Sequence, residues 1–200
     1  MKKTMIVAFS ALALTACGQG ADTTKDIIGD AIMAQAKRVD AIEGEWRGDD
    51  TARDAYRHPS ETLGFFSVRP EHTVIEYAPG GGWYTRILAP LLLDEGRYIA
   101  VGFDPEAVRP LGEDFVERVR ARGEVFSAES AKRMGLPEDK VPFYCSSAIP
   151  EELQGEIDRV LIFRTMHNLK RFGIADSEIE ALFKALKPGG LLGVVQHRAK

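Results

Sequence analysis

Residues 76–85 read EYAPGGGWYT, a segment in which three consecutive glycines separate two apolar stretches. An apolar run, residues 73–77, leads into it, and the apolar positions of residues 85–93 have helical spacing. Glycines lack a side chain, so the backbone can pass close to a ligand and offer its amide groups as donors. The segment therefore predicts a ligand-binding loop between a strand and a helix, with a plain strand-to-helix turn as the alternative.

Short apolar runs alternate with helical stretches along the rest of the chain. Strands are predicted over residues 73–77, 97–103, 141–145, 159–163 and 191–196, and helices over residues 85–93, 110–122 and 176–186. This alternation is typical of βα units whose parallel strands are joined by right-handed crossovers. It predicts an α/β fold with a Rossmann-like, doubly wound, mostly parallel sheet, which binds ligands beyond the carboxyl ends of its strands.

An acidic residue, Asp104, follows the second predicted strand. An acid at this place can accept hydrogen bonds from both ribose hydroxyls of an adenosine. Because Asp104 precedes Pro105, a helix cap is the alternative. A nicotinamide cofactor fits less well, since its Gly-x-Gly-x-x-Gly motif, counted from Gly80, puts Thr85 at the third glycine. An oxidoreductase is therefore the weaker reading.

Four blocks in this order resemble class I S-adenosylmethionine (SAM)-dependent methyltransferases. The spacing Glu76-x-Ala78-x-Gly80-x-Gly82 is similar to the first motif of that superfamily, and Asp104 stands at its ribose-binding acid. The segments FRTMHNL, residues 163–169, and LKPGG, residues 186–190, resemble the loop after the fourth strand and the turn before the fifth. Residues 53–66, taken with residues 80–85, are also similar to a branch of bacterial predicted methyltransferases, some of which carry export signals.

The resemblance implies that SAM is the cofactor and that its methyl group passes to an acceptor that the sequence does not identify. The implied SAM-binding residues are Glu76, Ala78, Pro79, Gly80, Gly81, Gly82, Asp104, Ser146, Ser147 and Ala148. In this scheme Glu76 and the glycine loop hold the amino-acid end of SAM, Asp104 the ribose, and residues 146–148 the adenine.

Two histidines are candidate catalytic bases. His167 follows the fourth predicted strand and would face the same cleft, although a structural role is the alternative. His58, with Arg57 and Tyr56 beside it, could close over the site from the N-terminal helical segment. In the family pattern a glycine stands where this chain has Ala78, which is small enough for the turn but has less backbone freedom.

The N-terminus resembles the export signal of a bacterial lipoprotein. Residues 1–16 combine a basic start with an apolar run that is shorter than the roughly 20 residues a membrane span requires. The sequence LTAC, residues 14–17, resembles a lipobox, which implies cleavage before Cys17 and lipidation of that residue; a plain signal peptide is the alternative. We expect an exported lipoprotein anchored to the membrane on the periplasmic side, and Gly18 is similar to that of lipoproteins sent to the outer membrane.

The remaining chain divides into three parts. Residues 17–25 are small and polar and predict a lipidated tether, and residues 26–69 predict a helical segment in which Pro59 ends whatever helix precedes it. Residues 70–200 form the SAM-binding domain. Because an exported protein meets no obvious supply of SAM, a membrane-tethered protein that binds SAM or a nucleoside without catalysis is a second hypothesis.

The composition narrows the function classes. The chain has 200 residues, of which 44% are hydrophobic and 28% charged, as in one globular domain. Its net charge of -4 argues against a nucleic-acid partner. Two cysteines are too few for a disulfide framework or a four-thiolate zinc site, and no metal is expected.

The end of the sequence predicts an unpaired sheet edge. Sheets of the superfamily normally have seven strands, whereas this chain ends at residue 200, just after the fifth predicted strand. Leu191, Leu192, Val194 and Val195 would then lie on an edge with unpaired backbone groups, which natural proteins avoid. We therefore expect that the C-terminal strands are missing and that the chain is a fragment; a partner chain that pairs with this edge is the alternative.

Overall fold

The computed structural model describes residues 20–197, with side chains from residue 28 onward. The signal segment, residues 1–16, and Cys17 lie outside the described residues. No helix in the described range is long and apolar enough to cross a membrane.

The first helix is longer than the sequence predicts. Helix α1 spans Gly20–Glu43, so residues 20–25, which the composition assigns to a flexible tether, are helical. The compact unit that carries the sheet begins within this helix, at Ala34.

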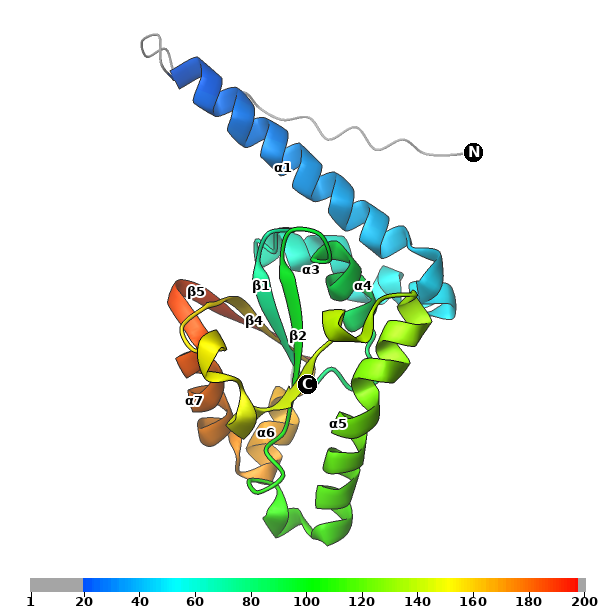
Figure 1. The fold of residues 1–200 in the computed structure, drawn as a ribbon, viewed down its shortest axis with the longest axis vertical. Coiled ribbons are helices and arrows are strands. Elements are labelled where there is room, and N and C mark those ends of the chain that lie inside the picture. Colours follow the sequence, from blue (N-terminus) through cyan, green and yellow to red (C-terminus); the bar gives the residue numbers. More distant parts are fainter. Residues whose placement is uncertain (1–19, 198–200) are drawn as a thin grey trace. The chain divides into compact units, whose positions relative to one another are not determined.

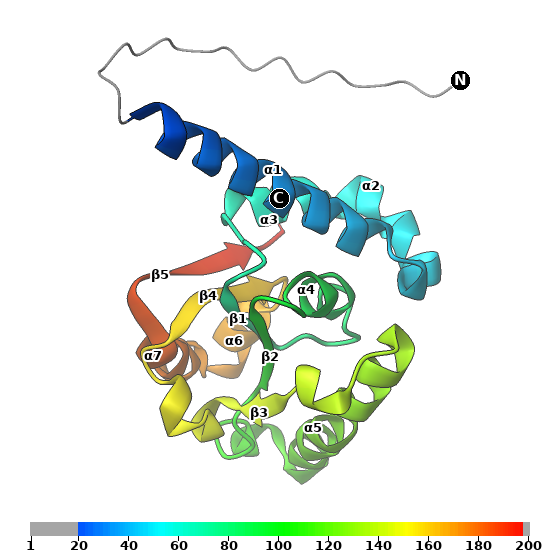
Figure 2. The ribbon, with the colours of Figure 1, turned by 45° about the horizontal axis from the view of Figure 1, so that its top comes forward.

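The sheet has five parallel strands in the order β3-β2-β1-β4-β5. The strands are β1 (Thr73–Tyr77), β2 (Arg97–Gly102), β3 (Phe143–Cys145), β4 (Ile157–Phe163) and β5 (Leu186–Val195). Figure 2 shows this order from β5 at the left to β3 at the bottom. The order reverses direction at β1, so the predicted doubly wound α/β fold is confirmed, and the crevice beyond the ends of β1 and β4 is where such sheets bind ligands.

Helices cover both faces of the sheet. They are α4 (Thr85–Leu91), α5 (Glu113–Met134), α6 (Met166–Phe172) and α7 (Ala175–Ala185), and Figure 1 shows α5 and α7 on opposite sides of the strands. Alternate residues of β1 enter two separate cores: Val74 packs with residues of α4, whereas Ile75 packs with residues of α6 and α7. Short 3-10 helices occupy connections: η2 (Arg109–Leu111), η3 (Glu138–Lys140), η4 (Ser146–Ala148) and η5 (Glu151–Leu153).

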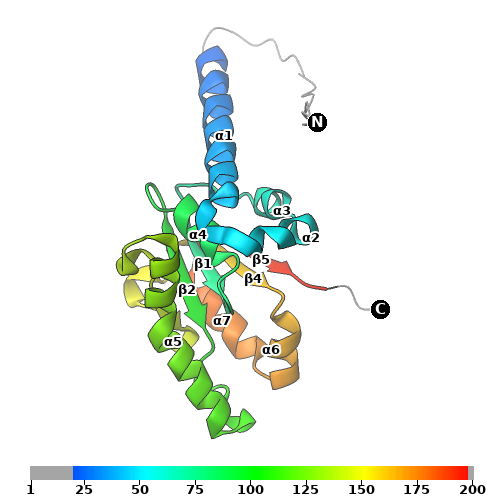
Figure 3. The same cartoon turned by 90° about the vertical axis from the view of Figure 1, so that its right-hand side faces the viewer.

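The segment between α1 and the sheet consists of short helices. They are η1 (Glu45–Arg53), α2 (Asp54–Arg57) and α3 (Pro59–Phe65). As predicted, the chain breaks before Pro59: His58 has a left-handed backbone with φ of 43°, and Pro59 occupies the first turn of the next helix. Figure 3 shows α2 near the end of β5.

Helix α5 and strand β5 extend well beyond their predicted ranges. Helix α5 continues far past residue 122, because Gly123 gives Phe143 room to pack against the helix; a Cβ at Gly123 would lie 3.0 Å from that ring. The helix ends at Gly135, whose φ of 67° forms a left-handed cap. The predicted turn at residues 186–190 lies inside β5 as a bulge, since Ile157 pairs with Leu186 and Arg159 pairs with Leu191.

Strand β5 is an edge of the sheet in the described part of the chain. The side chains of Leu191 and Val194 are 37% and 40% exposed, in line with the predicted apolar edge.

Candidate functional site

The loop after β1 has an unusual backbone. Ala78, Gly80 and Gly82 all have positive φ, at 49°, 57° and 73°. Ala78 replaces the glycine of the family pattern at such a position and carries the strain that a side chain causes there. Its amide donates to the carbonyl of Val101 at 2.7 Å, which ties the loop to β2. Apart from its two chain neighbours, no atom of the described residues lies within 4 Å of where a Cβ of Gly80 would stand, so the loop is open on that side.

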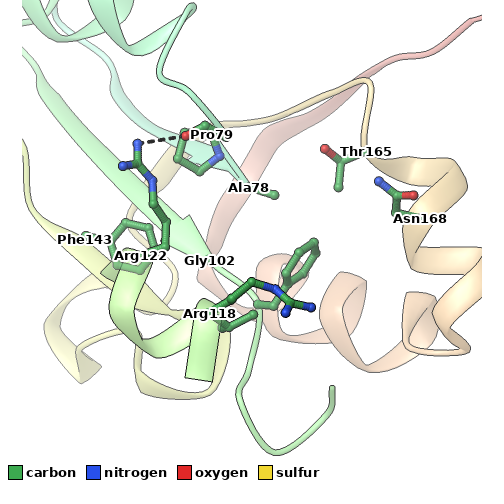
Figure 4. Close-up of a pocket in the computed structure, with 11 residues that line it drawn as sticks. Ala78, Pro79, Gly102, Arg118, Arg122, Phe143, Thr165 and Asn168 are labelled. Carbon is green, nitrogen blue, oxygen red and sulfur yellow. Dashed lines mark hydrogen bonds between the residues drawn. The ribbon is translucent and has the colours of Figure 1, made fainter. Parts of the chain in front are cut away.

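A cavity of about 300 Å³ lies against this loop at the carboxyl ends of the strands. The lining residues are Ala78, Pro79, Gly80, Gly102, Phe103, Arg118, Val119, Arg122, Phe143, Thr165 and Asn168. Figure 4 shows Thr165 and Asn168 on one side of Ala78 and Arg122 on the other. The predicted loop residues 78–80 and the end of β2 therefore meet at one cavity, which we call the glycine-loop cavity.

Two arginines of α5 contribute to the glycine-loop cavity and were not singled out from the sequence. Arg118 and Arg122 stand four residues apart, so both lie on one face of the helix. Arg122 donates to the carbonyl of Gly80 at 3.0 Å and thereby links α5 to the loop. The i, i+4 spacing of these arginines on an amphipathic helix was the signal available in the sequence.

Glu76, which is expected to hold the amino-acid end of SAM, does not line the glycine-loop cavity. Its carboxyl is 2% exposed and accepts hydrogen bonds from the hydroxyls of Thr85 and Tyr98, each at 2.7 Å. Burial raises the pKa of Glu76 to about 7, against the opposing effect of these two hydrogen bonds. The residue instead anchors the start of α4 beneath the loop.

Asp104 is half-buried next to the lining residues Gly102 and Phe103, but it is not itself in the cavity wall. Its Oδ1 accepts a hydrogen bond from the amide of Glu106 at 2.9 Å. This oxygen therefore plays the capping role that the sequence left open as an alternative. No hydrogen bond reaches Oδ2 from the described residues, and that oxygen is available to a ligand.

Glu178 of α7 positions the end of β2, and the sequence reading missed it. Its buried carboxylate accepts from the Tyr77 hydroxyl at 2.7 Å and from the Asp104 amide at 3.1 Å. Burial, followed by the charge of Glu178, raises the pKa of Tyr77. An acid at a buried position of a helix was the only signal.

The predicted adenine-binding residues lie elsewhere. Ser146 and Ser147 line a different cavity, against Ser177 and Lys184 of α7, and Ala148 follows them in η4. None of the three lines the glycine-loop cavity, where Phe143 of β3 stands instead. The short strand β3 ends at Cys145, and the chain then turns toward α7. The spacing of residues in the sequence does not indicate this turn.

The two candidate histidines have different surroundings. His167 is exposed on α6 between the cavity-lining residues Thr165 and Asn168, and its Nδ1 lies 3.2 Å from Nε2 of Gln196. His58 is exposed, lies 4.0 Å from Glu61, and lines neither the glycine-loop cavity nor the cavity described next. Its expected closure over the site is therefore not what the structure shows.

The neighbours of His58 do reach the carboxyl edge of the sheet. A second cavity, of about 200 Å³, is lined by Tyr56, Arg57, Tyr84, Arg164, Val195, Gln196 and His197. We call it the arginine cavity. Tyr84 stacks on Phe163 with ring centres 3.5 Å apart, which joins the ends of the glycine loop and of β4.

Trp83 of the glycine loop holds the N-terminal segment in place. The guanidinium groups of Arg47 and Arg57 lie 4.9 and 4.5 Å from the centre of its ring. Its indole nitrogen donates to the carbonyl of Asp50 at 3.0 Å. The loop is therefore fixed by η1 and α2 as well as by the sheet.

A SAM-dependent methyltransferase from Aquifex aeolicus superposes on the chain with a TM-score of 0.53 at 19% identity, covering 83% of this chain and 76% of that one. The chain shares its fold with a SAM-dependent methyltransferase. Weaker superpositions include the antibiotic-resistance methyltransferase Kmr, with a TM-score of 0.41, 21% identity and coverages of 62% and 60%. The CurJ carbon methyltransferase gives a TM-score of 0.44, 12% identity and coverages of 92% and 53%.

At the level of sequence there is no corresponding match. No protein-family model matches the chain, and no curated protein is detectably similar to it. The fold is therefore shown by structure alone.

Proposed function

We propose that the chain binds SAM in the glycine-loop cavity and transfers its methyl group to a small acceptor. The observation that carries this proposal is the cavity between the positive-φ loop, residues 78–82, and the end of β2, at the point where the strand order reverses. Parallel sheets of this order bind ligands at that point.

The residues present suit an adenosyl cofactor. The cavity has the size of a small-ligand site, and its wall is mostly apolar with a few polar groups. The open side of Gly80 admits a close approach of the ligand to the backbone. We assign Asp104 to the ribose through its free Oδ2, and Phe103 and Phe143 to the flat adenine ring.

Bound SAM supplies an electrophilic methyl group on a sulfonium ion. The contribution of the chain is to orient the reactants and to exclude water from them. We assign to His167, whose Nδ1 lies 3.2 Å from Nε2 of Gln196, the role of accepting a proton from the acceptor. Glu178 acts indirectly, by holding the backbone of Asp104.

The test is a calorimetric titration of the purified chain with SAM, with its demethylated product S-adenosylhomocysteine (SAH), and with NADH. We expect both SAM and SAH to bind. Asp104→Ala should weaken SAM binding by about 1–3 kcal/mol, because ribose hydroxyls lose their partner. The matched variant Asp139→Ala, in the exposed η3, should bind as the unmodified chain does. Absence of heat with both adenosyl compounds would refute the proposal, and binding of NADH alone would favour an oxidoreductase.

A further inference from the structure

Within the described range, the arginine cavity is lined by two arginines and by no acidic residue. Arg57 comes from α2 and Arg164 from the connection between β4 and α6. Neither forms a salt bridge with any carboxylate in the described part of the chain. The charge of Arg164, after burial, lowers the pKa of Arg57, so the two groups lie close enough to repel each other.

Two acids that precede Arg57 in the sequence have other partners, and Glu61, which follows it, lies 4.0 Å from His58. Asp54 accepts two hydrogen bonds from Arg47, at 2.6 and 2.8 Å. Asp50 pairs with Arg86 and Arg133. Among the described residues, no carboxylate therefore forms a salt bridge with Arg57 or Arg164, although the charge of Asp50 acts on Arg57 from a distance.

Arg164 is held in a strained conformation that directs it to this place. Its φ is 58°, in the left-handed region that residues other than glycine seldom adopt. Its amide donates to the carbonyl of Val195 at 2.7 Å, and its Nε donates to Nε2 of His197 at 2.9 Å. Both partners belong to the end of β5 or follow it, so the guanidinium is fixed at the edge of the cavity.

We propose that the arginine cavity binds a compact oxyanion, a carboxylate or a phosphate group. Guanidinium groups present planar pairs of donors that match both groups, and the two arginines that carry them line a space of about 200 Å³. A bound anion removes the repulsion between Arg57 and Arg164.

The same two loops wall both cavities. The β1–α4 loop gives Gly80 to the glycine-loop cavity, and Tyr84 at its end lines the arginine cavity; the β4–α6 connection gives Thr165 to the former and Arg164 to the latter. An anion in the arginine cavity therefore lies beside the glycine-loop cavity. This next step rests on the proposed function: the anion is the charged end of the methyl acceptor.

The chain offers a built-in probe, because it has two tryptophans. Trp83 lies under Arg57, whereas the indole of Trp46 donates to the carbonyl of Arg86 at 2.7 Å. The experiment records the two indole N–H signals by ¹H–¹⁵N NMR of the full chain while inorganic phosphate is added at constant ionic strength. We expect the Trp83 signal to shift saturably and the Trp46 signal to stay in place.

Variants separate this site from general salt effects. Arg164→Gln should weaken the apparent affinity for phosphate at least tenfold, because the anion loses one of its two guanidinium partners. Among the described residues, Arg164 forms no hydrogen bond or cation–π contact with either tryptophan, so the variant leaves the reporter groups in place. Arg171→Gln removes an equal charge from an exposed position on α6 and should titrate as the unmodified chain does. An unmoved Trp83 signal, or unchanged affinity in Arg164→Gln, would overturn the proposal. Acetate in place of phosphate shows which oxyanion the cavity prefers.

A second arm repeats the phosphate titration with saturating SAH. We expect the Trp83 shift to persist, because the two ligands occupy different cavities. If SAH abolishes it, the arginines bind the carboxylate of the cofactor, and the assignment to the acceptor is wrong. If SAH does not bind at all, the proposed function and the acceptor assignment both fail, whereas the anion site is judged by the first arm alone.

Discussion

The buried carboxyl of Glu76 makes the stability of the protein depend on pH. Its pKa is about 7 in the folded chain, against 4.5 as the ordinary value, because burial disfavours the charge. As pH rises from about 4.5 to 7, Glu76 loses its proton in the unfolded chain but keeps it in the folded chain. The free energy of unfolding therefore falls as pH rises from about 4.5 to 7, and it stays lowered above that.

Glu76→Gln removes this titration while keeping an oxygen for Thr85 and Tyr98. We expect the loss of stability between pH 5 and pH 8 to shrink by about 2–3 kcal/mol in urea unfolding. The exposed Glu117→Gln should leave the pH dependence as it is. If Glu76→Gln and the unmodified chain lose equal stability over this pH range, Glu76 does not have the raised pKa that we assign to it.

Among the secondary-structure elements, η1 and α2 depend on one buried ion pair. Arg47 is fully buried, and its guanidinium binds both oxygens of Asp54. Asp54→Ala leaves that charge without a carboxylate, so we expect about 3 kcal/mol of destabilisation, measured by chemical unfolding.

The control is the ion pair between Glu180 and Lys184, in which both side chains are exposed to water. Glu180→Ala should cost about 0.5 kcal/mol or less. Equal costs for Asp54→Ala and Glu180→Ala would show that the Arg47 pair does not fix this segment.

The sequence was sufficient to predict the elements but not their exact directions. All five strands were placed because apolar runs buried between helices leave a clear pattern. The length of α5 was missed: the helix was expected to end at residue 122, whereas it continues past Gly123, where the missing side chain leaves space for Phe143. The loop at Gly80 was found from its three glycines between a predicted strand and a predicted helix. In contrast, the turn of residues 146–148 toward α7 and the proximity of Arg57 to Arg164 depend on tertiary packing. Such contacts join residues far apart in the sequence and leave no local periodicity.

At the scale of the whole molecule, the sequence of residues 1–17 predicts a lipid anchor. The motif LTAC, residues 14–17, carries this expectation, and Cys17 lies outside the described residues. Two or more acyl chains give stable anchoring, whereas one is marginal. Cys17→Ser should therefore release the protein from the membrane fraction or block its processing, as seen by fractionation and mass spectrometry.

The control for this prediction is Cys145→Ser, which removes the other cysteine of the chain. It should leave the distribution between membrane and soluble fractions unchanged. Recovery of the unmodified chain in the cytoplasm with Met1 retained would contradict both the signal and the anchor.

The central claim is that the glycine-loop cavity is the cofactor site, and a crystal structure of the chain with SAH tests it most directly. We predict that SAH lies against Gly80, with its ribose at Asp104 and its adenine near Phe143, and that the arginine cavity remains free of it. SAH bound instead beside Ser146 and Ser147, in the cavity against α7, would contradict the account.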